Sequence, residues 1–166
     1  LTTSAAVALV NGLQAFFPNQ VFKLKWVNDL ILREHKVGGV ITEGVFNFEG
    51  QQYSAVIIGF AINVLPVQWP AALANKVGSV LLADEENVDL NQILAKILIE
   101  LLEMAESYRS GRYLGRYRDL SILIDHAITV KVGTETLTGV VQDISDQGGL
   151  VLLNSETGRS QTLYAG

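Results

Sequence analysis

The chain has 166 residues, of which 49% are hydrophobic and 17% charged, and its formal net charge is −5. This composition is typical of a globular protein, and the acidic balance argues against nucleic acid as a partner of this region. The sequence has no cysteine, which excludes disulfide bonds and thiolate metal sites and fits a cytoplasmic protein. The longest apolar stretch, residues 53–75, is interrupted by glycine, asparagine and two prolines, so we expect no membrane span.

The first part of the chain predicts a helix followed by antiparallel strands. Residues 1–17 place apolar side chains at helical spacing. Residues 30–32 and 36–46 have the character of two strands joined by a tight connection. Residues 53–65 are so continuously apolar that we expect a central strand covered on both faces. Before these, residues 21–26 alternate, which puts Phe22, Leu24 and Trp26 on one face and Val21, Lys23 and Lys25 on the other.

Residues 89–108 predict a long helix that begins at Asp89, with Gln92 in the capping-box position, and buries an apolar stripe against the sheet. Four arginines follow, and we interpret them as a solvated face at a helix end. They are Arg109, Arg112, Arg116 and Arg118. His35 and His126 are too scattered for a metal site, so we expect no metal-ligating residues.

From about Ile122 the sequence pattern changes to short β runs separated by glycine-containing turns, which predicts a small SH3-like β-barrel. The fold class is therefore α+β, with a mixed or antiparallel sheet and packed helices followed by this barrel. We expect two domains, residues 1–122 and an incomplete barrel over residues 123–166.

The stretch KWVNDLILREHKVGG, residues 25–39, brings charged groups and glycines together around two strands. Lys36 would supply a positive charge for a phosphate or carboxylate. Gly38 and Gly39 would let a flat or anionic ligand lie against the strand backbone and its N–H groups. Structural explanations compete with each of these roles, because a lysine at a strand start is usually solvated and paired glycines often mark a bulge or bend.

Two polar positions near this stretch allow the same two interpretations. Asn28–Asp29 after a strand is either part of a site or a turn. Asn63 ends the apolar strand with an amide that either recognises a nucleobase edge or fixes a turn.

Two motifs resemble the signatures of biotin protein ligases. KWVNDLIL followed by KVGGVITE is similar to that family's Lys-Trp-Pro-Asn-Asp and its Lys-hydrophobic-Ala/Gly-Gly strand, and IIGFAINV resembles its next, glycine-bearing strand. Val27 replaces the usual Pro and Ala61 the usual Gly. The order of elements agrees over essentially the whole chain, which implies a class II synthetase-like catalytic domain. The family's upstream glycine- and arginine-rich loop has no counterpart here, so we expect a fragment lacking the N-terminal part of that domain.

The resemblance implies an enzyme that uses ATP, Mg²⁺ and biotin to attach biotin to a lysine of a carboxylase's biotin carboxyl-carrier domain, through biotinyl-5′-AMP. Lys36 resembles the catalytic lysine, and Asp29 is the candidate that orients or deprotonates the acceptor amine. Phe60 stands where the family usually has a small residue. The implied binding residues are Asn28, Gly38, Gly39, Ile41, Gly59, Phe60 and Asn63.

Two alternatives to this function stay open. One is a lipoate-attaching ligase of the same superfamily. The other is a non-catalytic module, either a regulator that binds biotin or biotinyl-AMP or an SH3-like adaptor. Exposed strand edges make a homodimer a further expectation.

Overall fold

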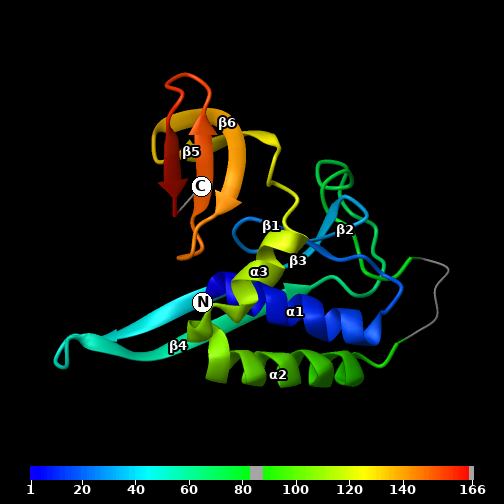
Figure 1. Cartoon of the computed structure of the whole chain (residues 1–166). Coiled ribbons are helices and arrows are strands. Elements are labelled where there is room, and N and C mark those ends of the chain that lie inside the picture. The colour runs from blue at the N-terminus through cyan, green and yellow to red at the C-terminus, as the bar shows by residue number, and fades with distance from the viewer. Residues whose placement is uncertain (83–87, 165–166) are drawn as a thin grey trace.

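The computed structural model describes residues 1–82 and 88–164, which form helices and two separate four-stranded antiparallel sheets (Figure 1). The fold class predicted from the sequence is confirmed. Isolated parallel bridges join Leu24 to Ser121 and Lys36 to Val77. The first sheet follows α1 (Thr2–Phe16) and has the order β1 (Lys23–Lys25), β2 (Asp29–Leu32), β3 (His35–Asn47) and β4 (Gln52–Ile62).

The helices α2 (Leu90–Ser107) and α3 (Arg112–Leu120), with the 3₁₀ turn η1 (Tyr108–Ser110) between them, connect the first sheet to the second. Within the described residues, the second sheet is not closed into a barrel, because its outer strands do not pair with each other. No helix in the described part of the chain has the length and apolarity needed to cross a bilayer. The second sheet consists of β5 (Ala127–Val132), β6 (Glu135–Ile144), β7 (Leu150–Asn154) and β8 (Ser160–Leu163).

Helix α1 is the centre of the core, since it contacts β2 and β3 of the first sheet and also packs against α2 and α3. Residues 5–10 and Leu13 are buried almost completely. The approach to α2 is closest at Gly12, where an added Cβ would lie 2.7 Å from the Cα of Ile97. A side chain at this position would separate the two helices, so glycine is required for their contact.

Helix α2 begins as predicted, because the Asp89 side chain accepts a hydrogen bond of 2.8 Å from the Asn91 amide. The prediction that its whole apolar stripe is buried against the sheet is wrong. Helix α2 packs mainly on α1, which already covers that face of the sheet. Ile93 and Ile97 are buried, whereas Leu102 remains 69% exposed.

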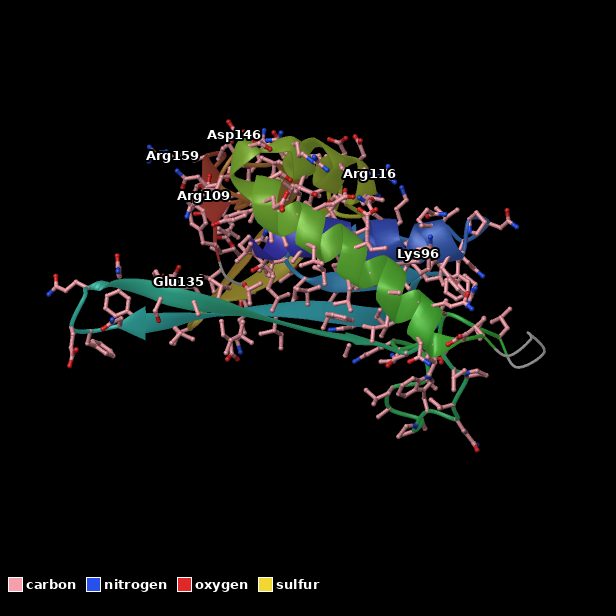
Figure 2. All side chains as sticks on the ribbon, turned by 90° about the horizontal axis from the view of Figure 1, so that it is seen from below. Lys96, Arg109, Arg116, Glu135, Asp146 and Arg159 are labelled. Carbon is pink, nitrogen blue, oxygen red and sulfur yellow. The ribbon has the colours of Figure 1, made fainter. Side chains whose placement is uncertain are left out.

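Strand β4 is an edge strand, and the prediction of a central strand covered on both faces is also wrong. It pairs only with β3, and the distal part of this hairpin projects beyond the helices (Figure 1, Figure 2). Tyr53 is 70% exposed, and only Ile58, Phe60 and Ile62 of β4 pack against the core. An apolar composition shows that a strand prefers burial, but it does not show how many neighbours the strand has.

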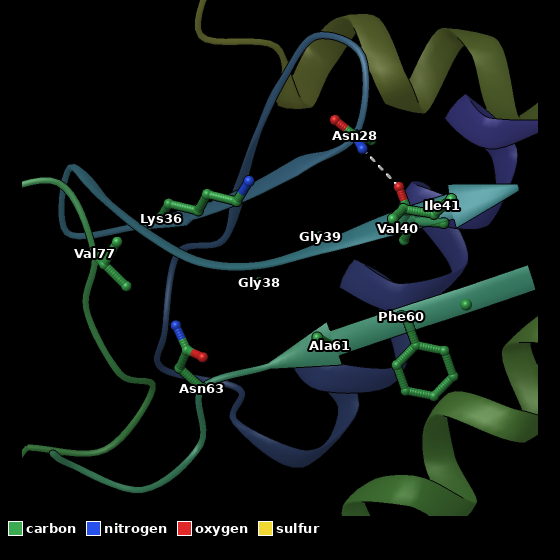
Figure 3. Close-up of a pocket in the computed structure, with 11 residues that line it drawn as sticks. Asn28, Lys36, Gly38, Gly39, Val40, Ile41, Phe60, Ala61, Asn63 and Val77 are labelled. Carbon is green, nitrogen blue, oxygen red and sulfur yellow. Dashed lines mark hydrogen bonds between the residues drawn. The ribbon is translucent and has the colours of Figure 1, made fainter. Parts of the chain in front are cut away.

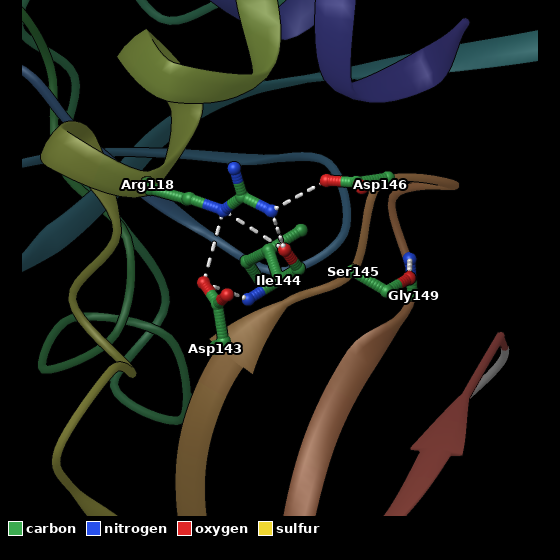
Figure 4. Close-up of polar contacts among 6 residues, drawn as sticks. All are labelled: Arg118, Asp143, Ile144, Ser145, Asp146 and Gly149. Atoms are coloured by element: carbon green, nitrogen blue, oxygen red, sulfur yellow. Dashed lines mark hydrogen bonds and ion pairs between the residues drawn. The ribbon is translucent and has the colours of Figure 1, made fainter.

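Arg118 joins the helical layer to the second sheet, so its placement on a solvated face is a wrong prediction (Figure 4). Its Nε donates to the carbonyl oxygen of Ile144 at 2.9 Å and forms an ion pair with Asp143 at 2.9 Å. A second ion pair reaches Asp146 at 3.1 Å. Arg116 is exposed on the same helix, as predicted.

Candidate functional site

A cavity of about 470 Å³ lies on the first sheet, with its floor on the face opposite α1 (Figure 3). Its volume falls in the range that small-molecule sites occupy. All seven residues predicted to bind ligand line it, together with Lys36, and Asp29 lies beside it. The lining residues are Asn28, Lys36, Gly38, Gly39, Val40, Ile41, Gly59, Phe60, Ala61, Asn63 and Val77.

The floor of the cavity is a patch of sheet with little side-chain cover. Gly39 is opposite Ala61 and Ile41 is opposite Gly59 in the β3–β4 register. Because side chains alternate between the faces of a strand, these four positions share the face that carries the cavity. An added Cβ at Gly59 would meet nothing within 4 Å. A flat ligand therefore has room to lie directly on the strand backbone.

A β-bulge at Val37 brings Lys36 onto the same face. The β2–β3 register steps from Leu30–Gly38 to Ile31–Lys36, which leaves Val37 without a partner in β2. In a regular strand Lys36 would share a face with Gly38, which is the buried face. The bulge instead puts Val37 in the core, where it is 0% exposed, and reverses the direction of the preceding side chain.

Lys36 forms an ion pair with Asp29, and both side chains keep contact with solvent, at 46% and 26% exposure. Asp29 is the cross-strand partner of Gly39, and a Cβ added to Gly39 would lie 3.8 Å from both Asp29 Oδ1 and Lys36 Cε. A Cβ at Gly39 would only touch the ion pair at ordinary van der Waals distance, and its closest neighbour would be the Asn28 carbonyl oxygen at 3.2 Å. The two predicted catalytic residues lie in direct contact at one end of the cavity.

Gly38 has a different role from Gly39. An added Cβ would lie 2.5 Å from the carbonyl oxygen of Ala61, so Gly38 is needed for the close approach of β3 and β4. The expectation that the N–H groups of both glycines face a ligand is wrong. Strand β3 is flanked by β2 and β4, and backbone amides of an inner strand point toward the neighbouring strands. Gly39 leaves its part of the cavity floor without a side chain.

Two asparagines support the cavity wall through backbone contacts. The Asn28 side chain donates to the carbonyl oxygen of Val40 at 2.8 Å, and the Val40 amide donates to the Asn28 carbonyl oxygen at 3.0 Å (Figure 3). The Asn63 side chain donates to the Gly78 carbonyl oxygen at 3.1 Å. Asn63 thus fixes the segment that carries Val77, and its contact with a nucleobase stays a prediction.

Phe60 contributes less to the floor than expected, because alternation puts its side chain on the opposite face from Gly59 and Ala61. Its ring points toward the helices, and with Ile62 it lines an apolar groove along α2 (Figure 3). The bulky residue at this position therefore leaves the floor open. Val77 is a lining residue that the sequence did not predict, since it comes from a segment far along the chain through its bridge to Lys36.

The loop 26–28, which carries Asn28, is held by the buried Tyr117, which the sequence did not single out, and by the half-buried Trp26. Tyr117 is 0% exposed and donates to the Val27 carbonyl oxygen at 3.1 Å. Burial raises the pKa of the Tyr117 phenol well above its usual range, and the nearby Asp29 carboxylate adds to the rise. The Trp26 indole donates to the Gly148 carbonyl oxygen at 3.0 Å, which ties the loop to the second sheet.

Comparison with known proteins finds similarity to biotin protein ligases. Residues 123–166 match the family model described as the biotin protein ligase C terminal domain. The bifunctional ligase/repressor BirA of Escherichia coli is 27% identical over 133 residues, covering 78% of this chain and 41% of that protein. The biotin–[acetyl-CoA-carboxylase] ligase of Mycobacterium tuberculosis is 28% identical over 171 residues, covering 100% of this chain and 60% of that protein.

The chain is a relative of the biotin protein ligases. The recognition made from its two motifs is thereby confirmed. This biotin protein ligase relative spans between 41% and 60% of the length of these curated proteins.

Solved structures show the same fold. A point mutant of the biotin protein ligase from Aquifex aeolicus, in complex with biotin, superposes with a TM-score of 0.83 at 20% identity, over 99% of this chain and 67% of that one. The same enzyme in complex with biotin and ATP gives a TM-score of 0.82 at 20% identity, over 99% of this chain and 68% of that one. A biotin protein ligase-like protein of unknown function from Silicibacter gives a TM-score of 0.78 at 16% identity, over 98% of this chain and 69% of that one.

Proposed function

We propose that this biotin protein ligase relative carries the reaction surface of an enzyme that attaches biotin to a lysine of a carboxylase carrier domain, with ATP as the second substrate and biotinyl-5′-AMP as the intermediate. The observation that carries the proposal is the ion pair of Lys36 and Asp29 at one end of a bare sheet floor. The relatives support it by their names, which describe biotin ligases. The catalytic part corresponds to residues 1–122 and the small β domain to residues 123–166.

Lys36 has its role in the first step, in which the biotin carboxylate attacks the α-phosphorus of ATP and pyrophosphate leaves. The step brings an anion against a polyanion, and two like charges about 4 Å apart repel by roughly 4 kcal/mol at an effective dielectric constant of 20. The Lys36 ammonium stands on the cavity face and offsets this repulsion. Its pairing with Asp29 holds the amine in place before substrate arrives.

Asp29 has its role in the second step. The carrier lysine must attack the mixed anhydride as a neutral amine, forming an amide bond and releasing AMP. Asp29 orients this amine and accepts its proton, since its carboxylate is partly exposed beside the cavity. The same carboxylate both holds Lys36 and receives the nucleophile.

The remaining residues divide the cavity between the two substrates. Gly39, Ile41 and Gly59 form the surface on which biotin lies. Because Gly38 has no side chain, β4 lies close to β3 and contributes its part of this surface. Asn63 lies near the adenine.

Asn28, at the opposite wall, supports the nucleotide phosphates through the loop it stabilises. Phe60 backs the floor from the far face.

The residues around the cavity do not fit a protein-held Mg²⁺ site. Within residues 1–82 and 88–164, no group of three or more His, Cys, Asp or Glu side chains could hold a metal ion. The described residues that line the cavity include no carboxylate, and Asp29 beside it is paired with Lys36. Mg²⁺ is commonly carried by substrate phosphates with few protein ligands, so we assign it to ATP and derive no step through it.

Calorimetry and transfer assays with the full-length enzyme test this function. We expect binding of biotin, ATP-dependent release of pyrophosphate, and labelling of one carrier lysine. Binding of lipoate in preference to biotin would favour the lipoate-attaching alternative. Binding of biotinyl-AMP without transfer to any carrier would favour the regulator. A homodimer through the unpaired edge of β4 is part of the proposal. Sedimentation of the full-length enzyme in an analytical ultracentrifuge tests it.

A further inference from the structure

We infer that a basic groove beside the cavity docks an acidic surface of the acceptor protein and so delivers its lysine to Asp29. This inference rests on the proposed function, because it names the partner surface of the same site. The groove has a volume of about 910 Å³ and adjoins the cavity at Lys36 and Val77. Its floor is the outer face of β1 and β2, and its walls are the segment 73–77 and the start of the β domain at Ile122 and Leu123.

The charge of the groove is opposite to that of the chain. Five of its lining side chains are cationic and two are acidic, although the formal net charge of the chain is −5. The alternation predicted for residues 21–26 produces this, since Phe22 and Leu24 are buried while Lys23 and Lys25 point into the groove. The cationic residues are Lys23, Lys25, Arg33, Lys36 and Lys76.

Three of these cations are available to a partner. Arg33 is used inside the protein, since it donates to the Gln20 side chain and to two backbone carbonyl oxygens, and Lys36 is paired with Asp29. Lys23, Lys25 and Lys76 form no ion pair within residues 1–82 and 88–164. Unpaired like charges gathered in one groove repel each other, and an acidic partner removes that repulsion.

The groove fits a polypeptide better than a free phosphate group. Phosphate sites surround a small anion with converging backbone N–H groups, often at a helix N-terminus. Here the lysines extend from an edge strand over a groove that is larger than the cavity, at about 910 Å³ against 470 Å³. Apolar side chains of Ile31, Leu73 and Ile122 lie between the charges. An acidic protein surface with some apolar residues matches this mixture.

The groove lies where a docked protein can place its lysine in the cavity. In the register of the first sheet, Lys25 is opposite Asp29 and Asp29 is opposite Gly39, so one continuous cross-strand row leads from the groove to the cavity floor. A lysine of a protein held over β1 and β2 therefore enters the cavity past Asp29. Docking from this side leaves the bare floor free for the acyl group that is being transferred.

Charge reversal in the full-length enzyme tests the inference. The variant K23E/K25E is compared with K96E/K131E, which reverses the same number of charges at exposed lysines on α2 and β5 (Lys96 in Figure 2). Three rates are measured: adenylate formation by pyrophosphate release, transfer to a purified carrier domain that has acidic residues around its lysine, and transfer to hydroxylamine. Hydroxylamine is a small neutral nucleophile that needs no docking.

We expect K23E/K25E to form adenylate and to acylate hydroxylamine as the parent does, while kcat/KM for the carrier domain falls on the order of tenfold at low salt. This deficit should disappear near 1 M salt, where the Debye length is about 3 Å. A carrier domain whose acidic residues are changed to lysine should regain transfer with K23E/K25E. K96E/K131E should behave as the parent in all three assays.

Three results would overturn the inference. The first is equal carrier transfer by the two double variants, and the second is a lower hydroxylamine rate in K23E/K25E. The third is a raised KM for ATP in K23E/K25E, which would assign the groove to the nucleotide phosphates. Failure of the parent itself to form an adenylate would instead remove the proposed function, so the two failures are distinguishable.

Discussion

Lys36 of β3 and Asp29 of β2 form an ion pair although they are not opposite each other in the sheet, where Lys36 is the partner of Ile31 and Asp29 the partner of Gly39. The diagonal contact exists because the bulge at Val37 turns Lys36 to the cavity face. The chemistry assigned to the cavity depends on this contact.

Replacement of Lys36 by alanine should leave the fold intact and slow adenylate formation. The side chain is 46% exposed, so little packing is lost, whereas loss of one preorganised charge at a reacting group costs about 10²–10³ in rate. Single-turnover release of pyrophosphate by the full-length enzyme measures this, with Lys96→Ala on α2 as the control. A Lys36→Ala rate within a few-fold of the parent would remove this lysine from the mechanism.

Replacement by alanine should lower stability at Gly38 and biotin affinity at Gly59. At Gly38 the new Cβ would lie 2.5 Å from the Ala61 carbonyl oxygen, so we expect a loss of about 1–3 kcal/mol in the free energy of unfolding. At Gly59 the Cβ would meet nothing within 4 Å, so stability should be kept while biotin affinity decreases, because the methyl group occupies the floor. Urea denaturation and calorimetry separate the two effects. Unchanged biotin affinity in Gly59→Ala would contradict the placement of the ligand on this floor.

The stability of the protein should decrease at alkaline pH because of Tyr117. Burial raises the pKa of this phenol in the folded state, so above about pH 10 the unfolded chain loses the proton and the folded chain keeps it. The contribution of Tyr117 is therefore complete below that pH and is lost as the pH rises toward the folded-state pKa. For one proton the slope is about 1.4 kcal/mol per pH unit.

Denaturation of the parent and of Tyr117→Phe across this range measures the slope. The parent should lose stability more steeply than the variant, and Tyr53→Phe, at a 70% exposed position, serves as the control. Equal slopes for the parent and Tyr117→Phe would contradict the expected titration.

Arg118 should contribute to stability through the contact between α3 and β6. Arg118→Ala removes the donors that the Ile144 carbonyl oxygen uses, together with the ion pairs to Asp143 and Asp146. We expect a decrease of about 1–2 kcal/mol in the free energy of unfolding, since the guanidinium is partly exposed and its ion pairs are screened. Arg116→Ala on the same helix should change it by less than about 0.5 kcal/mol. Equal effects in the two variants would show that the contact does not stabilise the protein.

Local patterns in the sequence determined much of this protein. The alternation of residues 21–26 predicted which side chains in and just before β1 are buried, and Phe22 and Leu24 are in the core. The resemblance of two motifs to the biotin protein ligases implied seven binding residues, and all seven lie around one cavity. The burial pattern could be predicted because alternation along a strand is a property of the residues themselves.

Only the tertiary structure decided the features that depend on neighbours across the sheet. The bulge that redirects Lys36 follows from the pairing of β3 with β2, and the edge position of β4 follows from the absence of a further strand among the described residues. Arg118 resembles its neighbouring arginines in sequence, yet it alone of the four reaches β6. Strand pairing and helix packing join residues far apart in the chain, so no local pattern records which partner each residue will have.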